Sequence, residues 1–237
     1  MTALLEVEGL TAGYGEVDIV HDVTLRCDAG EIVAVLGRNG AGKSTFLLAV
    51  GGALRRASGI VRIGGRLVGG PTYRRARSLI GLLPEGRSVF PSLTTKANLE
   101  VGGIDVGAAL DLFPELRSRL TIRAGLLSGG EQQMLSLARA MLRKPRVLLL
   151  DELSFGLAPV VSQRMCEALR GYAKEHGICV VLVEQQMLSA QQVADRAVIM
   201  SDGAFVLEMP IAELARRRAE IERLYLGEAV LERPAPA

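Results

Sequence analysis

The sequence is poor in cysteine and in net charge, and it contains no long hydrophobic run. Its three cysteines, Cys27, Cys166 and Cys179, are odd in number and lack metal-site spacing, so we expect reduced thiols in a cytoplasmic protein. A net charge of only +2 gives no strong electrostatic argument for a nucleic-acid partner. No apolar stretch approaches the roughly 20 residues that cross a bilayer, and the N-terminus lacks a signal-peptide pattern. We therefore expect any membrane attachment to come through a partner.

The rest of the composition is typical of a globular protein. Hydrophobic residues make up 49% and charged residues 23% of the 237 positions, an ordinary balance for a chain with a sizeable core. No internal repeat divides the chain, and we expect a single domain over residues 1–237. The segment 228–237 is expected to be a disordered tail.

A glycine-rich segment is the strongest motif in the sequence. Residues 37–45 fit the pattern G-x-x-x-x-G-K-[ST] and lie between a predicted strand at 32–36 and a predicted helix at 44–50. Such glycines let backbone N–H groups curl around a polyphosphate, and the helix start adds positive potential. The candidate nucleotide-binding residues are Gly37, Arg38, Asn39, Gly40, Ala41, Gly42, Lys43, Ser44 and Thr45.

Two side chains of this segment have specific expected roles. Lys43 would reach the β- and γ-phosphates, and the Ser44 hydroxyl would be a ligand of Mg²⁺. The alternative is an ordinary glycine turn before a helix. The glycines, the lysine and the serine all stand in their expected places, which argues against that alternative.

A second motif supports the first. The apolar run 147–150 predicts a strand, and it ends in the acid pair Asp151 and Glu152. In a phosphate-loop ATPase the first acid holds Mg²⁺ and the second polarises an attacking water. Alone, an acid pair after a strand is as often structural as functional, and the phosphate loop earlier in the chain favours function.

Three further residues are weaker candidates. Tyr14 stands between two glycines and could stack on a base, although alone it fits a packed turn residue better. Glu85 follows a predicted strand at 78–83 and could reach a metal or a water, although such an acid is more often a surface residue. Gln185 follows a predicted strand at 178–183, where the ligand-facing groups of open α/β sheets gather.

A capped helix follows a helical block in the second half of the chain. Residues 94–127 have a mostly helical pattern, broken at 102–103 and at Pro114. Ser128 and Glu131 then form a capping box. Gly129 and Gly130 open the capped helix and could offer a second site for phosphate oxygens, and the alternative is a structural cap alone.

Taken together, these ordered motifs resemble the nucleotide-binding subunit of ABC transporters over nearly the whole chain. Residues 127–132 resemble the family signature, and residues 154–157 fall where the family has a dimer-contacting loop. Tyr14 falls where the family stacks an aromatic ring on adenine. The resemblance implies an α/β fold: a phosphate-loop ATPase core with a mixed, mainly parallel sheet and flanking helices, an N-terminal antiparallel β region, and a small helical subdomain at 94–127.

Finer features resemble one branch of the family. Residues 83–91, 183–185 and 225–227 are similar to the smaller ATPase subunit of branched-chain amino-acid importers, and urea and amide importers share much of this pattern. The resemblance implies an ATPase that binds ATP and Mg²⁺ and powers an importer. The implied catalytic residues are Glu152 and Gln185, the implied metal ligands are Ser44, Asp151 and Glu85, and the implied ATP contacts are Tyr14, residues 37–45, Ser128, Gly129 and Gly130.

The resemblance also implies partners. Two ATP-binding subunits, here of different sequence, would close head to tail over ATP and drive two membrane permease subunits. An extracytoplasmic substrate-binding protein would deliver the cargo. The chain itself would lie on the inner face of the cell membrane, attached through the permeases.

Some positions depart from the general family pattern. Glu85 replaces the usual glutamine and Gln185 the usual histidine, and both changes fit the branch named above. Leu153 stands where a proline normally follows the catalytic acid, so we expect a less constrained backbone before the dimer-contacting loop. The block 94–127 is shorter than in that branch.

Other functions predict features that the sequence lacks. An ABC protein of translation would carry a second cassette, and one of DNA repair would carry a long coiled coil. The second alternative is a phosphate-loop GTPase or small-molecule kinase; a GTPase would carry Asn-Lys-x-Asp for guanine, which the sequence lacks. We therefore favour the transport ATPase.

Overall fold

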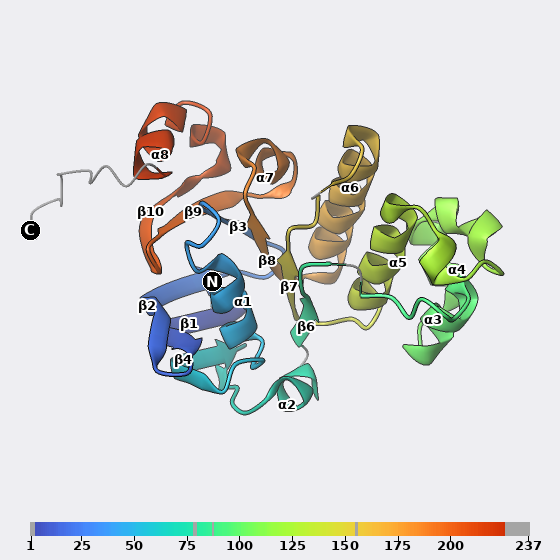
Figure 1. Ribbon diagram of the computed structural model, residues 1–237, viewed down its shortest axis with the longest axis horizontal. Helices are drawn as coiled ribbons and strands as arrows, with labels where there is room; N and C mark the ends of the chain where they lie inside the picture. Colours follow the sequence, from blue (N-terminus) through green and yellow to red (C-terminus); the bar gives the residue numbers. More distant parts are fainter. Residues whose placement is uncertain (1–2, 78–79, 87, 155, 226–237) are drawn as a thin grey trace, which may run out of the picture.

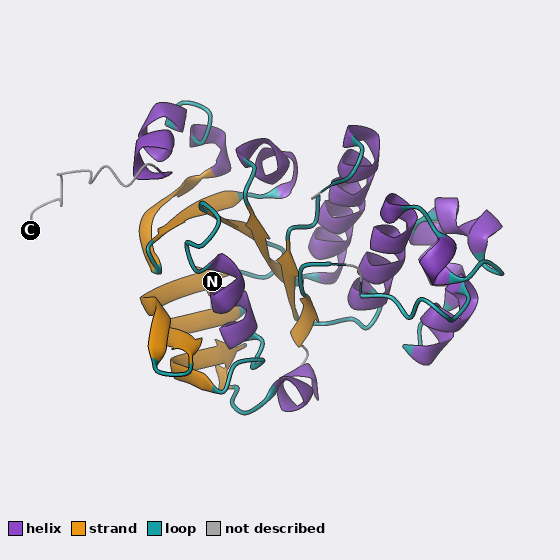
Figure 2. Ribbon diagram, in the orientation of Figure 1, coloured by secondary structure: helices purple, strands orange, loops and turns teal. Residues whose placement is uncertain are grey.

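Two β-sheets with a helix between them form the frame of the molecule (Figure 1). The computed structural model describes residues 3–77, 80–86, 88–154 and 156–225. The strands gather around helix α1 (Lys43–Val50), and the longer helices lie beyond the larger sheet (Figure 2). This arrangement confirms the α/β fold expected from the sequence, and the predicted tail 228–237 lies outside the described residues.

The smaller sheet is antiparallel, in the order β2-β1-β4-β5. Its strands are β1 (Leu5–Tyr14), β2 (Val17–Cys27), β4 (Arg56–Ile63) and β5 (Arg66–Leu67). The first two strands pair up to the turn between them, where Tyr14 lies opposite Val17. This pairing places the ring of Tyr14 at the end of the sheet nearest the phosphate loop.

The larger sheet is mainly parallel, in the order β10-β9-β3-β8-β7-β6. Its strands are β3 (Ile32–Leu36), β6 (Ile80–Leu83), β7 (Val147–Asp151), β8 (Cys179–Glu184), β9 (Arg196–Ser201) and β10 (Ala204–Pro210), of which only β10 pairs antiparallel. The register pairs Leu36 with Glu184, Asp151 with Val183, and Leu83 with Leu150. Four strands therefore end at the same edge, where ligands of open α/β sheets bind.

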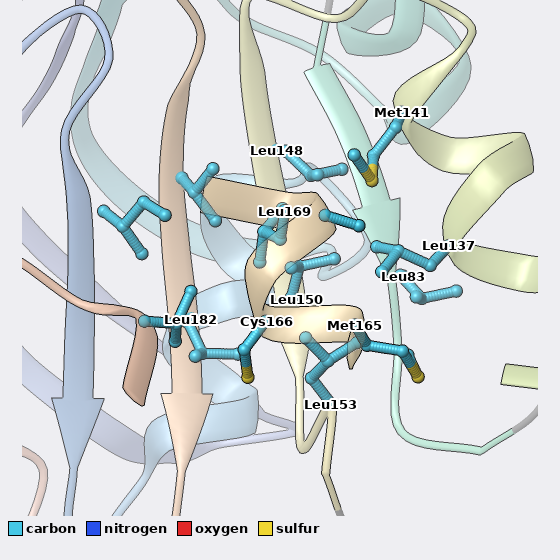
Figure 3. Packing of buried hydrophobic residues seen from close by; sticks show 14 of the residues in the cluster. Leu83, Leu137, Met141, Leu148, Leu150, Leu153, Met165, Cys166, Leu169 and Leu182 are labelled. Atoms are coloured by element: carbon cyan, nitrogen blue, oxygen red, sulfur yellow. The ribbon is translucent and has the colours of Figure 1, made fainter. Parts of the chain in front are cut away.

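Each face of the larger sheet has its own hydrophobic core. On one face, α1 packs between the two sheets through Phe46 and Leu47, which are fully buried. On the other face lie α5 (Gly129–Met141), α6 (Pro159–His176) and α7 (Met187–Val193). Figure 3 shows Leu148 and Leu150 of β7 beside Leu169 of α6 and Leu137 of α5. Burial on both faces explains why the central strands are continuously apolar.

The segment predicted to be helical at 94–127 consists of short helices. They are α3 (Thr95–Val101), α4 (Val106–Leu112), η1 (Pro114–Arg119) and η2 (Ala124–Leu126), separated at the glycines and proline that the sequence marks. Thr94 and Asp105 cap the first two by accepting hydrogen bonds from Ala97 N and Ala108 N. The block lies at the end of the molecule far from the antiparallel sheet (Figure 1).

Two segments outside the site differ from what their sequence pattern predicts. The amphipathic pattern at 211–226 predicts one helix, but the structure has η3 (Ile211–Glu213), a turn and α8 (Arg218–Tyr225). Leu214, fully buried, fixes the turn between them. The arginines at 74–77 suggest a solvated face around α2 (Thr72–Arg77), but Arg75 donates to Ala49 O and Val50 O and so caps the end of α1.

The helices of the described residues are all too short or too polar to cross a membrane.

Candidate functional site

A cavity of about 510 Å³ lies at the edge where the parallel strands end. Its lining contains residues from the phosphate loop, from the ends of three sheet strands and from the tip of the antiparallel sheet. These residues are Tyr14, Ile19, Asn39, Gly40, Gly42, Lys43, Ser44, Thr45, Glu85, Glu152 and Gln185. The fold therefore brings together, from five separate segments of the chain, most of the candidate site residues that the sequence predicts.

The phosphate loop has an open, ligand-shaped backbone. Gly40 and Gly42 have φ of 84° and 101°, a region that side chains other than glycine rarely adopt. No side chain caps the start of α1, so its first N–H groups are oriented toward the cavity without a protein side-chain partner. Lys43 Nζ donates to Gly37 O and to Arg38 O, each at 2.9 Å, and so spans the loop.

Carboxylates outnumber cations around the cavity. Burial raises the pKa of both Asp151 and Glu152, and the charge of Glu85 raises each further. Lys43 lowers both, but its own pKa is lowered by burial despite the nearby acids. A hydrogen bond with Ser44 also lowers the pKa of Asp151. The excess negative charge favours a bound cation.

Asp151 and Ser44 have the chemistry of a magnesium site. Asp151 Oδ1 is buried without a hydrogen-bond partner, and Ser44 and Glu85 line the cavity with oxygen atoms. Among the described residues no cluster of three or more His, Cys, Asp or Glu side chains forms a protein-only metal cage. Mg²⁺ typically binds through one or two carboxylates together with substrate phosphates, so this donor set fits it.

Glu152 has an unusual backbone. Its φ of 48° lies in the left-handed region, which is uncommon for a residue with a side chain and is typical of strained functional positions. Its N–H donates to Val183 O at 2.9 Å. The next residue, Leu153, is only 2% exposed and packs into the core shown in Figure 3. Leu153 is therefore an apolar anchor directly after Glu152, and the less constrained backbone expected from the missing proline stays a prediction.

Glu184 is a residue of this edge that the sequence does not assign to the site. It is 3% exposed and ends β8, one residue before Gln185. Its Oε1 accepts hydrogen bonds from Ser154 N at 3.2 Å and Ser154 Oγ at 3.0 Å. Burial raises its pKa to about 7, with Glu152 and Asp151 adding to the shift. The sequence does not reveal this contact, because Ser154 lies in the turn after β7 and Glu184, 30 residues further along the chain, ends β8.

The signature residues lie away from this cavity. Ser128 accepts from Glu131 N, and Glu131 Oε2 accepts from Ser128 N, so the capping box predicted from the sequence is present. Gly130 packs against α6 so closely that a Cβ would lie 2.8 Å from Val161 Cγ1. None of Ser128, Gly129 and Gly130 lines the cavity. Within one chain, these expected ATP contacts therefore do not reach the cavity that the phosphate loop lines.

Two tyrosines lie beside the phosphate loop from opposite ends of the chain. Tyr14 is 53% exposed at the cavity rim. Tyr225, the last residue of α8, accepts a hydrogen bond from Arg38 Nη1 through its carbonyl at 2.6 Å. Its own hydroxyl is buried without a partner, and burial raises its pKa to about 12. The C-terminal helix is therefore attached directly to the loop.

The loop, the acid pair and the parallel sheet that aligns them define a nucleotide-binding protein of the phosphate-loop class. Residues 20–154 match the family model described as ABC transporter. The chain belongs to this family, as an ATP-binding subunit with the ATPase fold.

Curated relatives extend the similarity over nearly the full chain. The chain is 41% identical to the high-affinity branched-chain amino acid transport ATP-binding protein BraG of Pseudomonas aeruginosa, covering 94% of this chain and 100% of that protein. It is 35% identical to the probable branched-chain amino acid transport ATP-binding protein LivF of Archaeoglobus fulgidus, covering 94% and 99%.

Solved structures show the same fold. An ATP-binding subunit of an ABC transporter aligns with a TM-score of 0.78 and 27% identity, over 95% of this chain and 99% of that one. A nucleotide-free ATP-binding cassette aligns with a TM-score of 0.84 over 94% and 99%, and at 19% identity it supports the fold alone.

Proposed function

We propose that this ATPase powers an importer of branched-chain amino acids. The observation that carries the cargo is the 41% identity to BraG, which extends over all of that protein. The branch-specific residues Glu85 and Gln185 both line the cavity, as an active role requires. Urea or short amides are the second candidate cargo, because importers of those molecules share the same branch pattern.

The cavity residues fit one ATP molecule with its magnesium ion. Tyr14 would stack on adenine, while the loop 37–45 would surround the phosphates with its N–H groups. Lys43 would exchange its two carbonyl partners for the β- and γ-phosphates. Ser44, Asp151 and Glu85 would hold Mg²⁺, which supplies charge stabilisation to the transferring phosphoryl group.

Glu152 and Gln185 would act on the water that attacks the γ-phosphate. Glu152 is the general base, and its raised pKa makes its carboxylate a better proton acceptor than an ordinary surface acid. Gln185 is exposed at the end of β8, with an amide that both donates and accepts. It would hold a γ-phosphate oxygen without changing charge.

The second half of each ATP site would come from another ATP-binding subunit. Ser128, Gly129 and Gly130 do not line the cavity of their own chain, so they would contact ATP bound to the partner, which we propose is a different chain. A permease subunit would contact the block 94–127. A cavity of about 340 Å³, lined by Gly102 of that block and by Ser88 and Arg139, offers a place for a cytoplasmic permease segment. The chain would then lie on the inner face of the membrane.

Purification of the complete transporter tests this function. We expect the chain to co-purify with two permeases and a second ATPase, and its ATPase rate in proteoliposomes to rise when a binding protein loaded with leucine, isoleucine or valine is added. Stimulation by a binding protein loaded with urea or acetamide instead would show that this molecule, and not a branched-chain amino acid, is the cargo. Co-purification with ribosomes or DNA, with no permease bound, would overturn the transport function.

A further inference from the structure

A buried carboxylate joins the end of β8 to the loop that follows the catalytic acid. Glu184 Oε1 receives both the N–H and the hydroxyl of Ser154. Ser154 Oγ also lies 2.9 Å from Ser189 Oγ of α7. An ionised carboxylate only accepts, so the Ser154 hydroxyl donates to Glu184 and accepts from Ser189. Three elements thus meet at one serine side chain.

This contact lies two residues from Glu152, on a short and strongly fixed segment. Glu152 N bonds to Val183 O, Leu153 is buried in the core, and Ser154 bonds to Glu184. The β8 strand therefore holds the segment 152–154 at two successive points. Between them Glu152 keeps its left-handed backbone, a conformation that persists only where its surroundings impose it.

Glu184 does not line the nucleotide cavity, but it is linked to two residues that do. Gln185 is the next residue in the chain, and Glu152 lies two residues before Ser154, the hydrogen-bond partner of Glu184. A residue in this position cannot contribute to nucleotide affinity by contact. It can set the direction of the two side chains that contact the nucleotide.

We infer that Glu184 is a positioning residue for ATP hydrolysis: its bond to Ser154 holds Glu152 toward the γ-phosphate and ties the segment 152–154 to the strand end that precedes Gln185. This inference rests on the proposed ATPase roles of Glu152 and Gln185 and is independent of the cargo. The carboxylate acts through an accepted hydrogen bond, so an acceptor of the same shape should replace it.

The experiment separates hydrolysis from nucleotide affinity in the purified transporter. Glu184→Ala removes the acceptor, and we expect single-turnover hydrolysis to slow about tenfold or more while the Kd for ATP stays unchanged. Ser154→Ala should slow hydrolysis similarly, and the double variant should be no slower than the worse single variant. Glu184→Gln keeps an acceptor oxygen and should restore most of the rate. Glu8→Ala, an acid on the antiparallel sheet, is the matched control.

Each outcome bears on the inference. A loss of affinity equal to the loss of rate in Glu184→Ala, or additive effects of the two alanine variants, would overturn it. If Glu184→Ala does not fold, Ser154→Ala and Glu184→Gln still decide, because a purely structural serine would leave the rate unchanged. A wild-type complex that hydrolyses no ATP would instead refute the proposed function.

Discussion

The two glycine-rich helix starts of this protein, at Gly42 and at Ser128, have opposite hydrogen-bonding states. The start of α1 has no side-chain cap and is surrounded by acids whose pKa values are raised. The start of α5 has a complete capping box, and hydrogen bonds from Arg119 and Ser128 lower the pKa of Glu131 despite its partial burial. The N–H groups at the start of α1 therefore need a ligand as their hydrogen-bond partner, whereas those at the start of α5 already have partners within the chain.

This difference matters for how the site assembles. A helix start that lacks internal partners gains most from bound phosphate and its metal ion, so binding should depend on the α1 edge alone. A helix start that is already satisfied can contact a ligand presented by another molecule without rearranging. The comparison predicts that substitutions at the two starts separate binding from hydrolysis.

The largest expected effect is at the catalytic acid of the α1 edge. Glu152→Gln should keep ATP binding and lower single-turnover hydrolysis by about 10²-fold or more, because it removes the general base. The measurement is phosphate release from the assembled transporter. Glu167→Gln, an exposed acid on α6, is the control. A variant that hydrolyses at the native rate would place the base elsewhere.

The next effect contrasts the two helix starts directly. Lys43→Ala should weaken ATP binding to the isolated subunit by about 10- to 150-fold, the range expected for hydrogen bonds to a charged group. Ser128→Ala should leave that affinity unchanged and should slow hydrolysis only in the assembled transporter. Titration calorimetry measures the ATP affinity of both variants, with Lys96→Ala, at an exposed lysine, as the control. Equal affinity losses in the two variants would contradict the division.

Two acids, Glu184 at the end of β8 and Glu131 in the first turn of α5, should give opposite pH dependences of stability. The native pKa of Glu184 is about 7 against 4.5 for the free side chain, so its contribution is fully present below pH 4.5 and is lost as pH rises through 7. That loss is about 3 kcal/mol. The pKa of Glu131 is lowered, so its contribution is present above its unfolded pKa and is lost as pH falls.

Urea denaturation of the isolated subunit at several pH values tests this contrast. Glu184→Gln should gain stability over the native protein above pH 7, and the gain should shrink toward pH 5. Glu131→Gln should lose stability at neutral pH, and its loss should shrink in acid. Parallel curves for native protein and Glu184→Gln would show that Glu184 does not titrate in this range.

The smallest expected effect concerns Gln185. Because its amide does not titrate, Gln185→His should introduce a pH dependence of hydrolysis between about 6 and 7.5 that the native transporter lacks. Gln185→Ala should slow hydrolysis less than Glu152→Gln does, because a neutral contact is weaker than a charged one. If hydrolysis by the native transporter already depends on pH in that range and the histidine variant adds no further dependence, then Gln185 does not contact the γ-phosphate.

Motif and periodicity predicted the elements that carry the site. The strand at 32–36 matches β3 residue for residue, because a uniformly apolar run between a turn and a glycine loop has one interpretation. The capping box at Ser128 is also local, so it was predictable from residue order alone. Local signals therefore predicted most of the cavity lining, and the fold class followed from the family resemblance that these motifs carry.

Contacts between distant segments were not predictable in the same way. The bond of Ser154 to Glu184 depends on the pairing of β7 with β8, and the cap that Arg75 gives to α1 joins residues 25 or more positions apart. The burial of Leu153 shows the same limit, because its position after the acid pair did not indicate that its side chain packs into the core. The division of 211–226 likewise follows from the burial of Leu214, which amphipathic periodicity does not reveal.

The placement of the tyrosines allows nucleotide binding to be followed by intrinsic fluorescence. The sequence has no tryptophan and four tyrosines, so intrinsic emission comes from the tyrosines alone. Tyr14 lines the nucleotide cavity and Tyr225 is bonded to the loop through Arg38, whereas Tyr172 is held between α5 and α6 by its bond to Met141 O. Stacking of adenine on Tyr14 should therefore quench part of the emission while Tyr172 provides a constant background. Tyr14→Trp would place a single tryptophan at the adenine position, and its fluorescence would report nucleotide occupancy in the isolated subunit without any attached dye.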